Sequence, residues 1–238
     1  MRTIIAFMIL ACYSFAADLK PLMTVTDKVL FQSDFSTPGT LDKTKTNYSI
    51  KQGTRWAIED GVLRGRPSTP EYQAGRKDHK GTEARLSLPV CPVEFAIRFS
   101  FRFIGGQYTG ATPMIELGHH ITRVQWTTNG IRLLADHDGL QVAADAKFIL
   151  QTNQWYQAFA EVRGGEALFQ FDGGPMLYGK HESIQADTHA FGIAGLKGGA
   201  VELDDITIWS IASNAPAAWE KTRAMLPAQT TVLIGAKK

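Results

Sequence analysis

The sequence predicts an all-β fold, a two-sheet antiparallel β-sandwich that ends in a short C-terminal helix. Short stretches in which apolar and polar residues alternate dominate the chain, and this period of two is typical of strands with one buried face. Gly-Gly, Asp-Gly and Asn-Gly pairs separate the stretches, as expected of tight turns between antiparallel strands. Long amphipathic helical segments do not alternate with the strands, which argues against an α/β fold.

The N-terminus has the pattern of a Sec-type signal peptide. Arg2 supplies a positive charge, residues 4–11 form a short apolar stretch, and small residues end it at Ala17. A membrane-spanning helix needs about 20 apolar residues, so no membrane span is expected. Residues 1–17 are therefore predicted to be a cleaved leader. The chain would then be an exported, secreted protein, either periplasmic or extracellular.

The two cysteines bear on the same question. Residues 9–12 also fit a lipobox with Cys12 as the lipidated residue, an alternative that ranks lower because its leader is unusually short. With cleavage after residue 16 or 17, Cys91 is the one cysteine that remains. A single cysteine forms no internal disulfide, so the fold must rest on its apolar core.

The clearest strand is predicted at residues 95–103, where large apolar side chains occupy every odd position. A second alternating stretch covers residues 155–163. The other predicted strands are residues 29–35, 56–59, 62–66, 83–88, 114–117, 121–126, 131–135, 167–171, 191–195 and 201–209. We expect them to form one sandwich domain over residues 28–211, a usual size for an undivided β domain.

The C-terminal segment, residues 212–238, has a different pattern. Apolar residues recur at helical spacing between residues 217 and 226, which predicts a short helix that docks Trp219 on the sandwich. Ser213 or Asn214 is the expected N-cap, because both side chains accept hydrogen bonds from the first helical N–H groups. A loose tail is expected after the helix.

Composition excludes some partners. The chain has 44% hydrophobic and 20% charged residues, and its 25 basic and 23 acidic residues give a net charge of +2. This is typical of a soluble folded protein, and a nucleic-acid partner is not expected because no long basic run occurs. The sequence also has no Gly-x-Ser-x-Gly, phosphate-binding glycine-rich or His-Glu-x-x-His motif.

Four of the six histidines lie in three polar segments, residues 75–81, 118–123 and 136–139. Histidine and carboxylate side chains could converge on a divalent metal, or a histidine could serve as a general base. A plain hairpin turn explains the Asp138-Gly139 pair equally well. If residues 121–126 form a strand, His120 lies on the same face as Trp126, and only one of His119 and His120 can point into a shared site.

Several motifs together resemble one family. They are Asp34-Phe35 at the end of the first strand, Trp56 to Gly65 with its Asp-Gly-Val-Leu core, Lys77-Asp78-His79-x-Gly81, His120-x-x-Arg123-Val124, Asp136 to Gly139, Leu203 to Trp209, and Trp219-Glu220-x-Thr222-Arg223. They resemble the 3-keto-disaccharide hydrolase-like domains of the concanavalin A-like lectin/glucanase superfamily. The resemblance covers about residues 28–226.

This resemblance implies a concanavalin-like jelly roll that acts on a sugar whose C3 hydroxyl is oxidised to a ketone. The ketone acidifies the hydrogen on C2, so a base can form an enediolate, the C1 group leaves, and water adds. We assign the base to His79 and its orientation to Asp78. Lys77 or Arg123 would stabilise the oxyanion. The candidate substrate-binding residues are His120, His137, Asp138 and Trp126, the two histidines serving as a second acid/base or as ligands of a divalent metal.

In sandwiches of this kind the first and last strands are neighbours, which would bring Asp34 close to Asp205. Their carboxylates could hydrogen-bond there or hold a structural Ca²⁺, although two carboxylates are few ligands for this ion. The Glu-x-Asp-x-x-Glu motif of retaining glucanases is absent, and Glu202 to Asp205 lacks its second glutamate. Hydrolysis by paired carboxylates is therefore not expected.

Two alternatives stay open. Residues 110–114 stand where the family has an Asn-Ser-Gly segment, so the chain could be a non-catalytic carbohydrate-binding module. Trp126, Tyr108 or Tyr72 would then be the stacking platforms. The third class is a cell-surface interaction module with no sugar site.

Overall fold

The fold is taken from a computed structural model that describes residues 19–37, 39–40, 48–185 and 189–234. The predicted leader, residues 1–17, and the lipobox alternative at Cys12 lie outside the described residues. Within the described part of the chain, no helix has both the length and the apolar character needed to cross a membrane.

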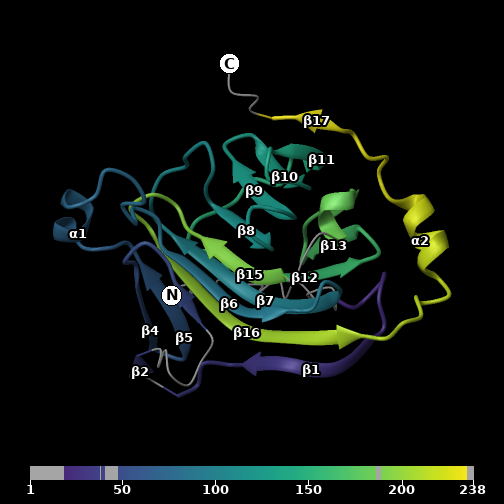
Figure 1. The fold of residues 1–238 in the computed structure, drawn as a ribbon, viewed down its shortest axis with the longest axis horizontal. Helices are drawn as coiled ribbons and strands as arrows, with labels where there is room; N and C mark the ends of the chain where they lie inside the picture. The colour runs from purple at the N-terminus through teal and green to yellow at the C-terminus, as the bar shows by residue number, and fades with distance from the viewer. Residues whose placement is uncertain (1–18, 38, 41–47, 186–188, 235–238) are drawn as a thin grey trace, which may run out of the picture.

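Two antiparallel sheets form the molecule, and the predicted sandwich is confirmed (Figure 1). The nine-stranded sheet consists of β14 (Met176–Lys180), β13 (Glu166–Phe171), β12 (Tyr156–Arg163), β7 (Phe95–Ile104), β16 (Ala200–Ile211), β5 (Val62–Arg66), β4 (Arg55–Glu59) and β2 (Gly39–Thr40), in that order, with β1 (Thr26–Ser33) beside β16. The eight-stranded sheet consists of β17 (Val232–Leu233), β11 (Leu140–Asp145), β10 (Gly130–Leu134), β9 (Arg123–Thr127), β8 (Met114–Leu117), β15 (His189–Ala194), β6 (Arg85–Cys91) and β3 (Ser49–Ile50).

The core between the sheets is aromatic. Strand β7 directs every odd side chain from Phe95 to Phe103 inward, each fully buried, as the alternation predicts. From the opposite sheet, Trp126 packs against Phe101 and Phe103, with ring centroids 5.4 and 5.9 Å apart, and Phe191 packs against Phe99 at 4.7 Å. Each buried aromatic ring contributes about 2 kcal/mol of transfer free energy, so this stack holds the two sheets together.

The first and last strands are neighbours, as expected. Ser33 of β1 lies opposite Ile206 of β16, while the other edge of β16 runs along β7. Five strands were not predicted, the two-residue strands β2, β3 and β17 and the longer β11 and β14, and β9 begins at Arg123 rather than at residue 121.

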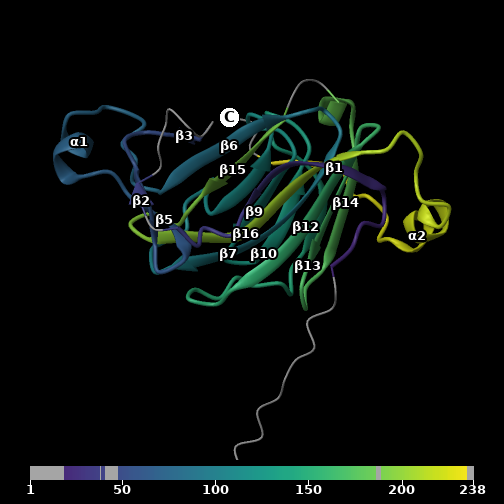
Figure 2. The same cartoon turned by 90° about the horizontal axis from the view of Figure 1, so that it is seen from below.

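The helices α1 (Pro70–Ala74) and α2 (Trp219–Met225) lie at opposite ends of the molecule (Figures 1 and 2). Trp219 docks on the sandwich as predicted, in a cluster with Met23 and Leu168. The expected cap is wrong, because Ala218 occupies the N-cap position without a side-chain hydrogen bond. The tail is not uniformly loose either, since β17 pairs with Leu140 and Gln141 of β11.

A buried carboxylate fixes the segment that follows the predicted leader. Glu161 of β12 is fully buried, and its Oε1 accepts hydrogen bonds from the backbone N–H groups of Met23 and Thr24, at 2.9 and 2.8 Å, and from the Thr24 hydroxyl at 2.8 Å. The N–H of Leu22 donates to the same carboxylate at 3.1 Å. This segment and α2 therefore pack on the nine-stranded sheet, and the eight-stranded sheet carries the pocket described next.

Candidate functional site

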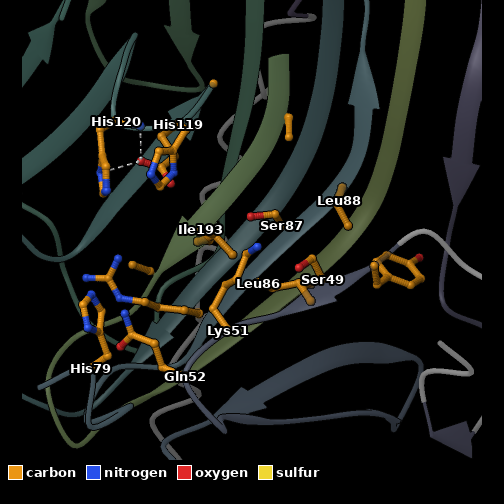
Figure 3. Close-up of a pocket in the computed structure, with 16 residues that line it drawn as sticks. Ser49, Lys51, Gln52, His79, Leu86, Ser87, Leu88, His119, His120 and Ile193 are labelled. Carbon is orange, nitrogen blue, oxygen red and sulfur yellow. Dashed lines mark hydrogen bonds and ion pairs between the residues drawn. The ribbon is translucent and has the colours of Figure 1, made fainter. Parts of the chain in front are cut away.

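A pocket of about 1040 Å³ opens over β3, β6, β15 and β8 of the eight-stranded sheet (Figure 3). Its floor is formed by the side of the sheet turned away from the aromatic core. The floor is low over β15, because the residues of β15 on this face, Ala190, Gly192 and Ala194, are small. A Cβ atom on Gly192 would lie 2.8 Å from Cγ of Glu116, so glycine at this position makes room for that carboxylate.

Cross-strand register aligns polar residues across the floor. Ser49 of β3 lies opposite Ser87 of β6, and Ser87 lies opposite Gly192. Gly192 in turn pairs with Glu116 of β8, which pairs with Arg123 of β9. Because side chains alternate between the two faces of a strand, this row lies on the outer face of the sheet while the neighbouring residues enter the core.

Glu116 is the acidic residue of the pocket. Its carboxylate accepts a hydrogen bond from the backbone N–H of His120 at 3.3 Å and lies 3.7 Å from Nδ1 of the same histidine. Burial raises the pKa of Glu116, and the positive charges of Arg85 and Arg123 oppose this rise. A carboxyl group with a raised pKa can exchange protons nearer neutral pH, which is what a general acid or base requires.

Three histidines gather beside this carboxylate. The rings of His119 and His120 are 4.1 Å apart, and the ring of His137 is 5.3 Å from that of His120. Burial, reinforced by the neighbouring positive groups, lowers the pKa of His120 to about 4. His120 is therefore a neutral imidazole at neutral pH, able to accept a proton from one nitrogen and donate from the other.

The turn that carries these histidines differs from the prediction. His119 and His120 were expected on a strand that would separate them, but residues 118–122 form a turn in which His120 has a φ of 62°. The N–H of Leu117 donates to the carbonyl of Thr122 at 3.1 Å and closes this turn. Both histidines therefore line the pocket.

His79 lies at the other end of the pocket, beside Gln52 (Figure 3). Ser68 holds its loop, since the Ser68 N–H donates to the carbonyl of Gly81 at 2.8 Å. A Cβ atom on Gly81 would lie 2.1 Å from the carbonyl oxygen of Gln52. Glycine there allows the loop to approach closely. Nδ1 of His79 is 3.4 Å from Asp78, as expected, but the His79 side chain is 74% exposed.

The remaining predicted residues are dispersed. Lys77 and Asp138 are exposed and do not line the pocket, and His137 reaches it only through its contact with His120. Arg123 lies under the histidine turn, where its Nη2 donates to the carbonyl of Asp136 at 3.2 Å. Burial lowers the pKa of Arg123.

Trp126 was predicted to bind the substrate and to stack on a sugar ring, and the structure shows that this prediction is wrong. Its side chain is 0% exposed and belongs to the aromatic core, so it cannot contact a bound sugar. Its position in β9 sends it inward, because β9 starts at Arg123 and alternate residues face opposite ways. Tyr108 also packs against the core, and Tyr72 is covered by the Arg76 guanidinium 4.9 Å from its ring centre.

The metal hypotheses find no support in the described part of the chain. No group of three or more His, Cys, Asp or Glu side chains is arranged there to hold a metal ion. Asp34 and Asp205 are exposed at the junction of β1 and β16. The Asp34 carboxylate accepts a hydrogen bond from the Ser36 N–H at 3.1 Å, which lowers the pKa of Asp34. This carboxylate therefore caps a turn.

Glu202 is likewise structural. It is fully buried on β16 between two arginines, with Nε of Arg64 2.7 Å from one carboxylate oxygen and Nε of Arg102 2.6 Å from the other. Its two oxygens are therefore occupied within the nine-stranded sheet.

Sequence reasoning missed several residues of the pocket, among them Lys51, Arg85 and Glu116. Arg85 and Glu116 lie within strand segments rather than in the polar loops where site residues were predicted. The usable signal was a charged residue at an outward position of an otherwise apolar strand, immediately before Gly118-His119-His120 in the case of Glu116.

No protein-family model and no curated protein matches the chain. Solved structures share its fold. One comes from work on endo-acting O-glycanases that prominent members of the human gut microbiota express to initiate mucin breakdown. It is 12% identical, covers 78% of this chain and 100% of its own, and has a TM-score of 0.54.

Two further structures are similar to the same extent. SCLam, a non-specific endo-β-1,3(4)-glucanase of family GH16, is 12% identical over 80% of this chain and 97% of its own, with a TM-score of 0.51. LamA from Z. galactanivorans, in complex with laminaritriose and laminaritetraose, is 11% identical over 78% of this chain and 100% of its own, with a TM-score of 0.53. At such identities the similarity concerns the fold alone: the chain shares the two-sheet jelly-roll β-sandwich of these structures.

Proposed function

We propose that this chain is a carbohydrate-active protein that binds a sugar in the Glu116 pocket and transfers protons there. The observation that carries the proposal is the pairing of Glu116 with His120 at the floor of the pocket, 3.7 Å apart. Burial favours the neutral form of both groups. Such a pair can remove a proton at one atom and return it at another.

The pocket lining favours one class of chemistry. Among the described residues that line it, Glu116 is the one carboxylate, whereas hydrolysis by paired carboxylates needs two flanking the bond. A single acid/base pair beside a cation suits removal of a proton next to a carbonyl group. The 3-keto-glycosides implied by the sequence resemblance are substrates of this kind, since their C2 hydrogen is acidified by the C3 ketone.

The steps can be assigned to residues. Glu116 in its ionised form, beside the neutral imidazole of His120, removes the C2 hydrogen, and the electron pair passes to the C3 oxygen as an enediolate. The positive charges of Arg85 and Arg123, which act on Glu116, favour the negative charge that develops on that oxygen. The enediolate then expels the C1 group, which takes up a proton, and addition of water completes net hydrolysis. His79, the base predicted from sequence, lines the same pocket and is the alternative base.

Two variants separate these assignments. The purified protein is incubated with a chromogenic 3-keto-glucoside, and release of the aglycone is measured. Glu116→Gln is expected to lower kcat by at least about a hundredfold, the usual contribution of a general base, while His79→Ala acts mainly on KM. Equal losses of kcat would move the base to His79. Binding without turnover in the unmodified protein would identify a non-catalytic carbohydrate-binding module instead.

We propose further that the chain is exported, with residues 1–17 as its leader. The support is the charge, length and small-residue end of that segment, together with the anchoring of residues 22–24 by Glu161 directly after it. N-terminal sequencing of the mature protein tests this. A lipid-modified Cys12 at the new terminus would replace the proposed cleavage site.

A further inference from the structure

We infer that the sugar bound in this pocket carries an anionic group, a carboxylate or a sulfate, and that Arg85 and Lys51 hold it. The inference rests on the proposal that the pocket binds a sugar, and it specifies the class of that sugar. It comes from the charges of the lining. Besides Glu116 and the phenol of Tyr48, the ionisable side chains that line the pocket are all basic: Lys51, His79, Arg85, His119 and His120.

Arg85 is the centre of this arrangement. It stands at the start of β6, in the strand position opposite Ala194 of β15, so no bulky neighbour covers it on that side. The residue is half-buried, and its Nε is fully buried with no hydrogen-bond partner. A buried donor without a partner is destabilising, and more so when it is charged. The unpaired Nε shows that the protein does not hold this guanidinium by hydrogen bonds to it, and since Nε itself is covered, a ligand in the pocket would meet the terminal Nη groups.

Other arginines of this protein show the contrast. On the nine-stranded sheet, Arg64 and Arg102 are paired with Glu202, and Arg66 is paired with Glu59 at 2.6 Å. The fold thus supplies carboxylates where arginines are structural. In the described part of the chain Arg85 makes no such ion pair. Its charge acts on Glu116 only from a distance, where it opposes the rise in the Glu116 pKa that burial causes.

Neighbouring arginines are already engaged. Arg123 donates to the carbonyl of Asp136, and Arg132 donates through Nε and Nη2 to the side-chain oxygen of Gln125 at 3.0 and 2.7 Å. Nε of Arg123 is also buried without a hydrogen-bond partner, but neither Arg123 nor Arg132 lines the pocket, so both add positive potential without meeting a ligand there. Arg85 lines the pocket, and its guanidinium N–H groups donate to no residue of the described part of the chain.

The geometry of a guanidinium suits an oxyanion. Its planar fork can donate two parallel hydrogen bonds to a carboxylate or a sulfate, and charge-assisted bonds of this kind are about twice as strong as neutral ones. Lys51 extends from the segment after β3 into the same pocket (Figure 3). Ser49, Ser87 and Gln52 line the space between as uncharged donors and acceptors for sugar hydroxyls.

The test is an NMR titration that follows the Nε–H signal of Arg85 in the full-length protein, assigned with the Arg85→Lys variant. The probes are glucuronate, glucose 6-sulfate, glucose and inorganic sulfate. We expect an anionic sugar to shift the Arg85 signal and to bind at least about tenfold more tightly than glucose, the size of one charge-assisted contact. The Nε–H signals of Arg64 and Arg102, which donate to Glu202, are internal controls and should stay in place.

The two anionic probes distinguish a carboxylate from a sulfate as the recognised group. Arg85→Gln should reduce the affinity for the anionic sugar to that for glucose. Lys221→Gln, a change on the exposed face of α2, should leave the affinity unchanged. Melting curves of both variants show whether they are folded.

Three results would overturn the inference. In the first, glucose binds as tightly as the anionic sugars and shifts the His119 and His120 signals. The pocket would then be a sugar site that has no preference for a charged sugar. In the second, inorganic sulfate binds as tightly as glucose 6-sulfate. The pocket would then recognise an anion and not the sugar that carries it. No shift of any pocket signal with any probe contradicts both the sugar site and its anionic class.

Discussion

Replacing Glu202 by glutamine should destabilise the protein severely without touching the pocket. The Glu202 carboxylate is 0% exposed and lies between Arg64 and Arg102, each of which donates through Nε at 2.7 and 2.6 Å. Glutamine keeps the shape of the side chain, so no cavity forms. It removes the negative charge that both guanidinium groups face, and it turns an NH₂ donor toward one of them.

The magnitude follows from the burial of this triad. Breaking a buried ion pair by removing one partner costs about 3–5 kcal/mol, because an uncompensated charge is left in a poorly solvated place. The arginines here are partly exposed, at 23% and 28%, so water can reach them and the lower half of that range is expected. For a chain of this size, about 3–4 kcal/mol corresponds to a fall in Tm of about 6–16 °C.

Thermal and urea unfolding of the Glu202→Gln variant measure the effect. The matched control is Glu220→Gln on α2, whose side chain is 73% exposed and pairs with Arg223. Removing an exposed pair changes stability by about 1 kcal/mol or less. The reasoning is refuted if the two variants lose the same stability, since burial of the triad would then contribute nothing.

Three further predictions follow from other parts of the structure. Glu161→Ala should free the segment after the leader, so that the amide of Thr24 exchanges with deuterium much faster while amides of β7 keep their protection; unchanged exchange at Thr24 would show that the carboxylate does not hold it. Gly192→Val should abolish sugar binding, because a Cβ there already lies 2.8 Å from Cγ of Glu116 and must displace that side chain; a melting curve checks that the variant is folded, and binding isotherms that match the unmodified protein would contradict the proposed floor. The folded protein lowers the pKa of His120 to about 4, from an ordinary value of 6.5. Between these two pH values His120 is therefore protonated in the unfolded chain and neutral in the folded chain. Stability from this group is complete above pH 6.5 and is lost as the pH falls toward 4. The raised pKa of Glu116 acts in the opposite direction above its ordinary value of 4.5, so the comparison is made against His120→Gln. The unmodified protein should lose more stability than this variant between pH 6.5 and 4, and parallel curves would be inconsistent with a buried neutral imidazole.

Much of the fold is readable from the sequence because period-two alternation reports directly on burial. The Phe95–Phe103 stretch illustrates this, since each odd residue enters the core. The strands β2, β3 and β17 were missed because two residues are too few to show a period. The longer missed strands, β11 and β14, alternate weakly, because small side chains stand at buried positions, as at Gly179 of β14. Trp126 failed as a site residue for a related reason. An aromatic ring that could stack on a sugar is chemically identical to one that fills a core, and the strand register decides between them.

The site was only partly predictable. The polar segments containing His79 and His119-His120 do line one pocket, because both are turns at the same side of one sheet. What the sequence could not show is that β6, β15 and β8 are neighbours in that sheet although β15 lies far from the other two in the chain. This pairing brings Arg85 and Glu116 to the floor, with the small residues of β15 between them. Long-range register of this kind leaves no local mark on the sequence.

The histidines provide the most direct test of the central claim, that a sugar binds over β6, β15 and β8 beside Glu116. Ring signals of all six histidines can be followed by NMR while a 3-keto-glucoside is added. The account predicts that the signals of His79, His119 and His120 shift together and saturate with one dissociation constant, while that of His189, buried in β15, stays in place. Saturable binding that leaves these three signals unmoved would place the sugar elsewhere and contradict the account.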